Sequence, residues 1–394
     1  MMINQNIVCF AKDWSEDPTS NNHVMRVLAK HNRVLWLNSI AMRKPSLSSG
    51  RDIKKIFTKL SSLRQGAKQV SENLWVYTPI VLPFPSSKMA AQANRRILKA
   101  ALALLRRRLK MDRFQLWSFL PTVAPYIGNL GEELSVYYCA DEWTQLKYLD
   151  ANTMRTMEAD LLRKVDVFFA TAHSLLESKK THNPCGYLAL HGVDHEHFSR
   201  TLRDDVQVHP EIAGLPRPIL GFFGLLQHWI DQDLLLYLSE RHPEWSIVLI
   251  GSATTDISRL KTRSNIHHIE RRPYAELPSY CKGFSVGLIP FVLDELTKHV
   301  NPIKLREYLS AGLPVVSTAL PEVALYEGIC SVASSKEEFV AACESAIAQD
   351  SPAARQERSQ RMEQETWDKK VAEVGDHVLD VIAKRQTHCF RNAR

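Results

Sequence analysis

The chain has 394 residues, of which 45% are hydrophobic and 24% charged, values typical of folded proteins that exclude wholesale disorder. This length exceeds what one hydrophobic core usually organises, so two domains are expected. The longest apolar run, residues 100–105, is far shorter than the roughly 20 residues of a membrane-spanning helix. The first residues lack the basic and apolar regions of an export signal, so we expect a cytoplasmic protein.

Positive charge is concentrated in the first half of the chain. Residues 1–200 carry 28 Lys and Arg against 17 Asp and Glu, whereas residues 201–394 carry 22 against 26. One domain is therefore expected to face an anionic partner. The seven cysteines are scattered and form no Cys-x-x-Cys pair, which favours reduced thiols over a structural zinc site.

Short apolar runs alternate with longer helical patterns along both halves, which is typical of parallel sheets flanked by helices. In the first half we predict strands at 7–10, 33–37, 114–119, 134–139, 165–171 and 187–190, and helices at 21–30, 121–130, 153–164 and 174–180. In the second half we predict strands at 219–223, 246–250, 266–269, 284–289 and 314–318, and helices at 231–241, 277–282, 302–311 and 336–349. One long helical pattern follows residue 349.

The predicted fold class is α/β, with two Rossmann-like, doubly wound domains facing each other across a cleft. Residues 200–218 contain charges and prolines without apolar periodicity, so they form the best candidate linker. We therefore expect an amino-terminal domain at 1–205, a carboxy-terminal domain at 206–365 and a final helix at 366–394.

The most informative segment, residues 301–318, reads NPIKLREYLSAGLPVVST. Pro302 suits the first turn of a helix, and Lys304 and Glu307 share one face of that helix. Gly312 permits the helix to end before a buried strand. A lysine at a helix N-terminus suits a diphosphate, and a carboxylate one turn later can accept hydrogen bonds from a ribose diol. The alternative is an ordinary surface Lys–Glu pair.

This pattern resembles the donor-site helix of GT-B nucleotide-sugar glycosyltransferases. It is most similar to that of bacterial exopolysaccharide enzymes such as the xanthan-pathway glucuronosyltransferase and the teichuronic acid transferases. Other segments also resemble the family: YYCADEW at 137–143, HGVD at 191–194, GFFG at 221–224, RPY at 272–274, GLIPF at 287–291 and ETW at 365–367. The resemblance covers most of residues 130–375 and implies that the final helix crosses back to the first domain.

The resemblance implies a nucleotide-sugar donor, most commonly carried by UDP, and a set of donor-binding residues in the second domain: Gly224, Glu270, His299, Asn301, Ile303, Lys304 and Glu307. Lys304 would bind the donor phosphates, and Glu307 would meet the ribose hydroxyls or the nearby sugar. Glu270 would read the nucleobase and ribose, with an ordinary solvated charge as the alternative. His299 stands where many retaining enzymes of the family carry a second glutamate, which leaves the stereochemistry open.

An inverting transfer needs a general base for the acceptor hydroxyl, and we predict Asp141 for this role with Glu142 as the alternative. Asp141 follows the predicted strand 134–139, and ligands of open α/β sheets lie outside the carboxyl ends of the strands. The competing interpretation is an aspartate that caps the next helix. We expect no metal or other cofactor, because Lys304 and the helix terminus meet the phosphate charge.

Residues 95–110 have the pattern of a basic amphipathic helix. Leu98, Leu102 and Leu105 recur at helical spacing, and seven basic residues accompany them with no acid: Arg95, Arg96, Lys99, Arg106, Arg107, Arg108 and Lys110. Such a helix can lie in an anionic membrane interface. Alternatively, it packs on its own sheet with a solvated outer face. We predict membrane contact, which fits the lipid-linked acceptors that the resemblance implies.

Together these patterns predict a glycosyltransferase on the inner face of the plasma membrane. Its acceptor would be lipid-linked or a polysaccharide, and its pathway cell-surface polysaccharide biosynthesis. A retaining transferase of the same fold and a nucleotide-sugar epimerase are the enzymatic alternatives. A basic nucleic-acid-binding module is the non-enzymatic one, but the sequence has no recognisable nucleic-acid motif, so no nucleic-acid partner is expected.

Overall fold

The computed structural model describes residues 2–16, 18–40, 66–82, 84, 87–146 and 149–392, the last seven without their side chains. The chain divides into two compact units. Unit 1 comprises Met1–Leu190 and Lys370–Arg394, and unit 2 comprises His191–Lys369. The observed division precedes the expected boundary at residue 205, because α6 (His195–Ser199) and a following 3-10 turn pack against α10 (Leu277–Gly283) within unit 2.

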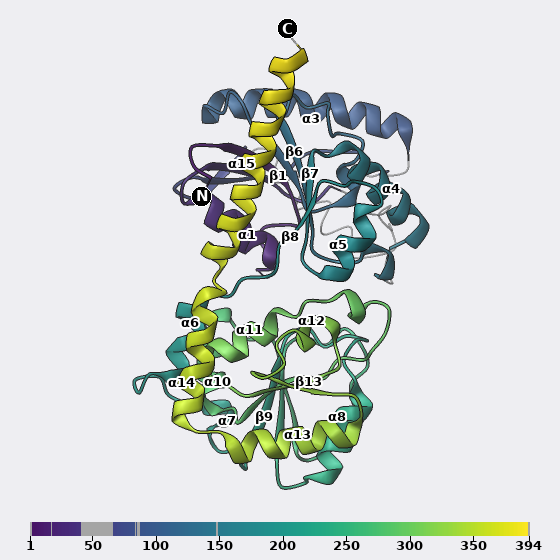
Figure 1. Ribbon diagram of the computed structural model, residues 1–394. Helices are drawn as coiled ribbons and strands as arrows, with labels where there is room; N and C mark the ends of the chain where they lie inside the picture. Colours follow the sequence, from purple (N-terminus) through teal and green to yellow (C-terminus); the bar gives the residue numbers. More distant parts are fainter. Residues whose placement is uncertain are drawn as a thin grey trace. The chain divides into compact units, whose positions relative to one another are not determined.

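Unit 1 contains an eight-stranded sheet in the order β3-β4-β2-β1-β5-β6-β7-β8, parallel except for the β3–β4 pair. The strands are β1 (Asn6–Phe10), β2 (Arg33–Leu37), β3 (Lys68–Ser71), β4 (Leu74–Tyr77), β5 (Gln115–Ser118), β6 (Leu134–Cys139), β7 (Val167–Ala170) and β8 (Gly186–Leu188). The longer helices of unit 1 are α1 (Ser20–Ala29), α3 (Lys88–Leu109), α4 (Ala151–Lys164), α5 (His173–Lys180) and most of α15 (Trp367–Asn392). In Figure 1, α15 is the yellow helix that ends at the carboxyl terminus.

Unit 2 contains a six-stranded, fully parallel sheet in the order β11-β10-β9-β12-β13-β14. Its strands are β9 (Ile219–Phe223), β10 (Ser246–Ile250), β11 (Ile266–Ile269), β12 (Val286–Ile289), β13 (Val315–Thr318) and β14 (Ser331–Ala333). The chain builds outward from β9 in one direction and from β12 in the other, so the order reverses between them. Ligands of doubly wound folds bind at this switch point, outside the carboxyl ends of the strands.

Two groups of helices surround the sheet of unit 2 (Figure 1). The helices α8 (Gln232–Arg241) and α13 (Lys336–Gln349) contact each other and the strands. The helix α11 (Ile303–Ser310) contacts β12, β13, α6 and α14 (Pro352–Arg361). The shorter helices are α7 (Pro210–Ala213), α9 (Ser258–Lys261) and α12 (Pro321–Ala324).

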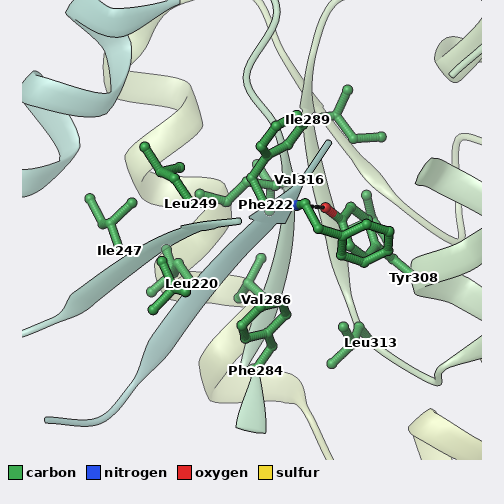
Figure 2. Packing of buried hydrophobic residues seen from close by; sticks show 14 of the residues in the cluster. Leu220, Phe222, Ile247, Leu249, Phe284, Val286, Ile289, Tyr308, Leu313 and Val316 are labelled. Carbon is green, nitrogen blue, oxygen red and sulfur yellow. Dashed lines mark hydrogen bonds between the residues drawn. The ribbon is translucent and has the colours of Figure 1, made fainter. Parts of the chain in front are cut away.

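The core of unit 2 consists of the buried strand residues and the aromatic side chains packed against them (Figure 2). Fully buried strands of a parallel sheet are apolar along their whole length, which explains why these runs are recognisable in the sequence. Tyr308 of α11 packs where β12 carries Gly287, because a Cβ there would lie 2.6 Å from the tyrosine ring. The hydroxyl of Tyr308 accepts a hydrogen bond from the backbone N–H of Phe223, drawn as the dashed line in Figure 2.

The α/β class and the two parallel sheets are confirmed, and most predicted strands lie within a residue or two of the observed ones. The predicted helix at 121–130 is wrong: only Pro121–Val123 forms a 3-10 turn, and hydrogen-bonded turns follow it. The single helix expected after residue 349 is also wrong, because a 3-10 turn (Met362–Gln364) separates α14 from α15. In the part of the chain that the structure describes, no helix is both long and apolar enough to cross a membrane.

Candidate active site

The N-terminus of α11 lies in unit 2, beside its switch point. Pro302 is the N-cap residue, and its side chain makes no capping hydrogen bond to the first turn of this helix. The sequence analysis placed Pro302 in the first turn of the helix. In the structure Pro302 comes one residue before that turn, because its backbone is extended rather than helical. The first-turn N–H groups of a helix have no partner within the helix and carry partial positive charge. This helix end is therefore suited to an anion.

Strands β9 and β12 separate at the switch point. Their pairing ends at Gly221 of β9 and Gly287 of β12. Beyond this point β12 no longer pairs with β9, and the backbone N–H of Phe223 donates instead to the Tyr308 hydroxyl at 3.1 Å. Gly224 then turns with φ of 149°, a conformation that side chains rarely adopt. The strand opening and the glycine turn leave backbone accessible at the carboxyl end of β9.

Lys304 reaches from α11 to this turn. Its ammonium lies 5.0 Å from the centroid of the Phe223 ring, and its Cε would be 3.3 Å from a Cβ on Gly224. The ammonium also pairs with the Glu307 carboxylate at 2.9 Å. The Lys304 side chain is 21% exposed and that of Glu307 5%. The structure thus brings Gly224, Lys304 and Glu307 together, with the lysine still accessible to a ligand.

The remaining predicted donor residues lie in unit 2 and differ in how far they are buried. Asn301 is buried before α11, and Ile303 is half-buried in its first turn. His299 is half-buried at the end of a 3-10 turn (Thr297–His299). Glu270 is exposed after β11, which is an edge strand, two positions from β9.

Arg306 is a residue of this helix that the sequence analysis did not single out. Its side chain is fully buried, and it donates hydrogen bonds to the Asn301 amide oxygen at 2.8 Å and to the Tyr326 hydroxyl at 2.6 Å. Its Nε lies 3.5 Å from a carboxylate oxygen of Glu365. Arg306 therefore fixes the segment that leads into α11. The available signal in the sequence was an arginine beside Leu305 and three residues before Leu309, on the apolar side of the helix.

One Asp-x-Asp triplet, a pattern that can hold a divalent cation, begins α8. Its carboxylates are engaged otherwise, because Asp231 caps α8 through the N–H of Leu234 and Asp233 pairs with Arg259 at 2.8 Å. Among the described residues, no group of three or more His, Cys, Asp or Glu side chains is arranged to hold a metal ion.

The two acidic residues after β6 of unit 1 have different surroundings. Glu142 is buried, caps the 3-10 turn Trp143–Gln145 through Thr144, and pairs with Lys179 at 2.7 Å. Burial alone would raise the pKa of its carboxyl, but Lys179 and Thr144 outweigh burial and lower it. The helix-capping role considered for Asp141 therefore belongs to Glu142.

Asp141 is exposed, and its carboxylate forms no hydrogen bond or ion pair with the described residues. The surrounding protein nevertheless removes part of its hydration, which raises the pKa of this carboxyl. Asp141 is thus the freer of the two carboxylates and fits a general base better than Glu142.

The basic helix predicted at residues 95–110 is the second half of α3. Leu98, Leu102 and Leu105 pack into the core of unit 1, as in the alternative interpretation of this helix. The outer face carries exposed basic residues together with exposed Met89, Ile97 and Leu104. Two basic side chains of this helix form hydrogen bonds within the protein: Arg95 donates to Asn129, and Arg106 donates to the backbone of Met111.

No family model matches the sequence. A curated relative from Bacillus subtilis (strain 168), named "Putative teichuronic acid biosynthesis glycosyltransferase TuaH", is 24% identical over 263 residues, which are 61% of this chain and 65% of TuaH. The chain therefore matches less than two thirds of that relative's length.

Solved structures match nearly the whole chain. Anabaena HepE in complex with UDP and glucose is 11% identical, with a TM-score of 0.65 over 96% of this chain and 100% of HepE. The sucrose-phosphate synthase of Thermosynechococcus elongatus is 12% identical, with a TM-score of 0.68 over 97% of this chain and 100% of that enzyme. The chain has the fold of these GT-B glycosyltransferases, which confirms the resemblance and the fold class expected from the sequence.

We expect Arg306→Leu to lower the free energy of unfolding by about 3 kcal/mol, because it leaves Glu365, Asn301 and Tyr326 without their buried partner. Urea unfolding followed by tryptophan fluorescence measures this loss. Arg361→Leu is the control, since Arg361 forms an exposed pair with Glu357 and should change stability by less than about 1 kcal/mol. Equal losses in the two variants would contradict the role assigned to Arg306.

Proposed function

We propose that the protein is a glycosyltransferase that uses a nucleotide-sugar donor, with UDP as the carrier. The observation that carries this proposal is the meeting of Lys304, the N-terminus of α11 with its proline N-cap and the Gly224 turn at one switch point. A cation, the first-turn N–H groups of a helix and accessible backbone suit a diphosphate. The named activity of TuaH and the UDP bound to HepE support the same chemistry.

In the proposed donor site, Lys304 binds the diphosphate without leaving Glu307. An ammonium has three donors, so one can remain on the Glu307 carboxylate while the others reach phosphate oxygens. Glu307 accepts hydrogen bonds from the ribose or the sugar, and Asn301 and Ile303 line the pocket. Glu270 reads the nucleobase and ribose, and His299 contacts phosphate or sugar. As the bond between the sugar and UDP breaks, its electron pair stays on the diphosphate, whose charge Lys304 and α11 stabilise without a metal.

Asp141 acts as the general base of an inverting transfer. Its carboxylate accepts the proton of the acceptor hydroxyl while the hydroxyl oxygen bonds to the anomeric carbon and UDP leaves. The free carboxylate of Asp141 supports this role, and His299 in place of a retaining enzyme's glutamate supports inversion. The acceptor is a lipid-linked sugar or a polysaccharide in cell-surface polysaccharide biosynthesis.

We also propose that the outer face of α3 binds the cytoplasmic face of an anionic membrane. This face combines exposed Arg96, Lys99, Arg107, Arg108 and Lys110 with apolar side chains, of which Met89 is 83% and Leu104 71% exposed. The helix contains no acidic residue. Lysine and arginine attract anionic headgroups, and the apolar side chains can enter the interface between them.

Lys304→Met should weaken UDP binding about 10- to 100-fold, because a hydrogen-bonded ammonium at the diphosphate is lost. Isothermal titration with UDP measures the affinity. Lys298→Met, which removes an exposed lysine of the same unit that pairs with Glu295, should bind UDP as the wild type does. Unchanged UDP affinity in Lys304→Met would remove the lysine from the donor site.

Asp141→Asn should lower kcat about 100- to 10,000-fold while UDP affinity persists, because only proton transfer is lost. In the wild type the base works deprotonated, so kcat/KM should rise as pH increases through the pKa of Asp141. Since this pKa is raised, the rise should occur at higher pH than for an ordinary aspartate. Release of UDP from donor and acceptor at several pH values measures both effects; near-normal turnover in the variant would exclude Asp141 as the base.

The wild-type protein should co-sediment with vesicles that contain phosphatidylserine and be released by high salt. Replacing Arg96, Lys99 and Arg107 with Gln should weaken this binding by roughly 100-fold, at about 1 kcal/mol per basic side chain. A variant with Gln at Arg113, Arg155 and Lys180, three exposed basic residues of unit 1 outside α3, has the same net charge and should bind normally. Equal weakening in both triple variants would argue against a specific membrane face on α3.

A further inference from the structure

A cluster of three buried charges in unit 1 includes Glu142, the residue that follows Asp141. Lys179 of α5 forms ion pairs with Glu142 at 2.7 Å and with Glu158 of α4 at 2.8 Å. Each of the three side chains is less than a tenth exposed. The pKa of the Lys179 ammonium is raised, because its carboxylate partners outweigh the burial that would lower it. The lysine therefore stays charged throughout the range in which proteins work.

Hydrogen bonds satisfy the rest of the cluster. Tyr137 of β6 donates to Glu158 at 2.6 Å, and the indole N–H of Trp143 donates to the Tyr137 hydroxyl at 3.0 Å. The Thr144 hydroxyl donates to the second oxygen of Glu142 at 2.6 Å. Burying charges costs several kcal/mol, and apolar side chains often stabilise such a position equally well. Packing alone therefore does not account for this cluster.

The chain is held on both sides of Asp141, by the cluster on one side and by Thr171 on the other. Glu142, the next residue, is fixed by Lys179 and Thr144. The carbonyl of Ala140, the preceding residue, accepts a hydrogen bond from the Thr171 hydroxyl at 3.1 Å. The carbonyl of Asp141 itself contacts the Cys139 thiol at 3.5 Å. The Asp141 carboxylate, in contrast, forms no bond to the described residues. The backbone that carries it is held by the bonds on either side and cannot turn freely.

We propose that Lys179 is a positioning residue that acts through Glu142 to hold the Asp141 carboxylate in the orientation needed for proton transfer. This inference rests on the proposed role of Asp141 as the base. The Lys179 ammonium is bonded to Glu142 and Glu158, so it would act on Asp141 through its neighbour Glu142. Its effect is to keep the neighbouring backbone in one arrangement, so that the base does not have to be oriented during the reaction.

The test compares Lys179→Met and Glu142→Gln with the wild type. Lys179→Met leaves two buried carboxylates unpaired and can fail to fold, so Glu142→Gln carries the test in that case. The latter variant keeps the size of the side chain and leaves Lys179 paired with Glu158. In folded protein we expect kcat to fall about 10- to 100-fold, because a small misplacement of a reacting group has this cost. UDP affinity, measured by titration, should not change, because the proposed donor residues lie in unit 2.

Lys180→Met is the matched control. Lys180 follows Lys179 on α5, but its side chain is 40% exposed and pairs with the exposed Glu177 of the same helix. This variant should keep the wild-type kcat. A kcat in Glu142→Gln equal to that of Lys180→Met would overturn the inference.

A double-mutant cycle separates this inference from the proposed function. If Glu142 acts through Asp141, adding Glu142→Gln to Asp141→Asn should cause no further loss of kcat. Additive losses would mean that the cluster acts independently of Asp141 and would overturn the positioning role. Full activity of Asp141→Asn with an inactive Glu142→Gln would instead overturn the proposed base itself.

Discussion

The candidate donor site depends on the hydrogen bond between the Tyr308 hydroxyl and the N–H of Phe223. The two strands at the switch point diverge, so this N–H, buried at the end of β9, lacks a strand partner and would be costly to leave unpaired. Tyr308 supplies the partner, and the glycine at position 287 gives its ring room against β12. The bond therefore ties α11 to the turn after β9. Lys304 lies one helical turn before Tyr308 and is thereby held over that turn.

Much of the secondary structure of unit 2 could be predicted, because it follows from patterns within short segments of the sequence. Buried parallel strands read as short apolar runs, and the helix between two of them places Lys304 and Glu307 on one face by its period alone. The ion pair between these residues follows directly from their spacing. Three strands escaped prediction. All four residues of β3 are exposed and β14 has only three residues, so these two lack the signature, whereas β4 is a short apolar run that the sequence analysis missed.

The unpredicted parts depend on contacts between distant residues. Arg306 lies in the same segment as Lys304, but its structural role depends on its contacts with Tyr326 and Glu365. The spacing of residues within the helix does not reveal these contacts. The leucines of α3 show a related difficulty. Periodicity indicates that one face of a helix is apolar, but it does not tell whether a sheet or a lipid surface covers that face. In α3 the sheet covers the leucines, and a sparser apolar set remains exposed on the other side.

The adjacent carboxylates after β6 show how surroundings give similar groups different chemistry. Asp141 and Glu142 lie in the bend after β6, where one side chain is exposed and the other is buried. Glu142 turns inward, where Lys179 keeps it ionised and bound, which makes it a poor proton acceptor. Asp141 turns outward with a raised pKa and no bond to the described residues, which are the properties of a usable base. The sequence analysis preferred Asp141 and kept Glu142 as the alternative, but it could not show what distinguishes them, because the lysine that binds Glu142 lies on another helix. The same lysine, by fixing one carboxylate, leaves the other free and oriented.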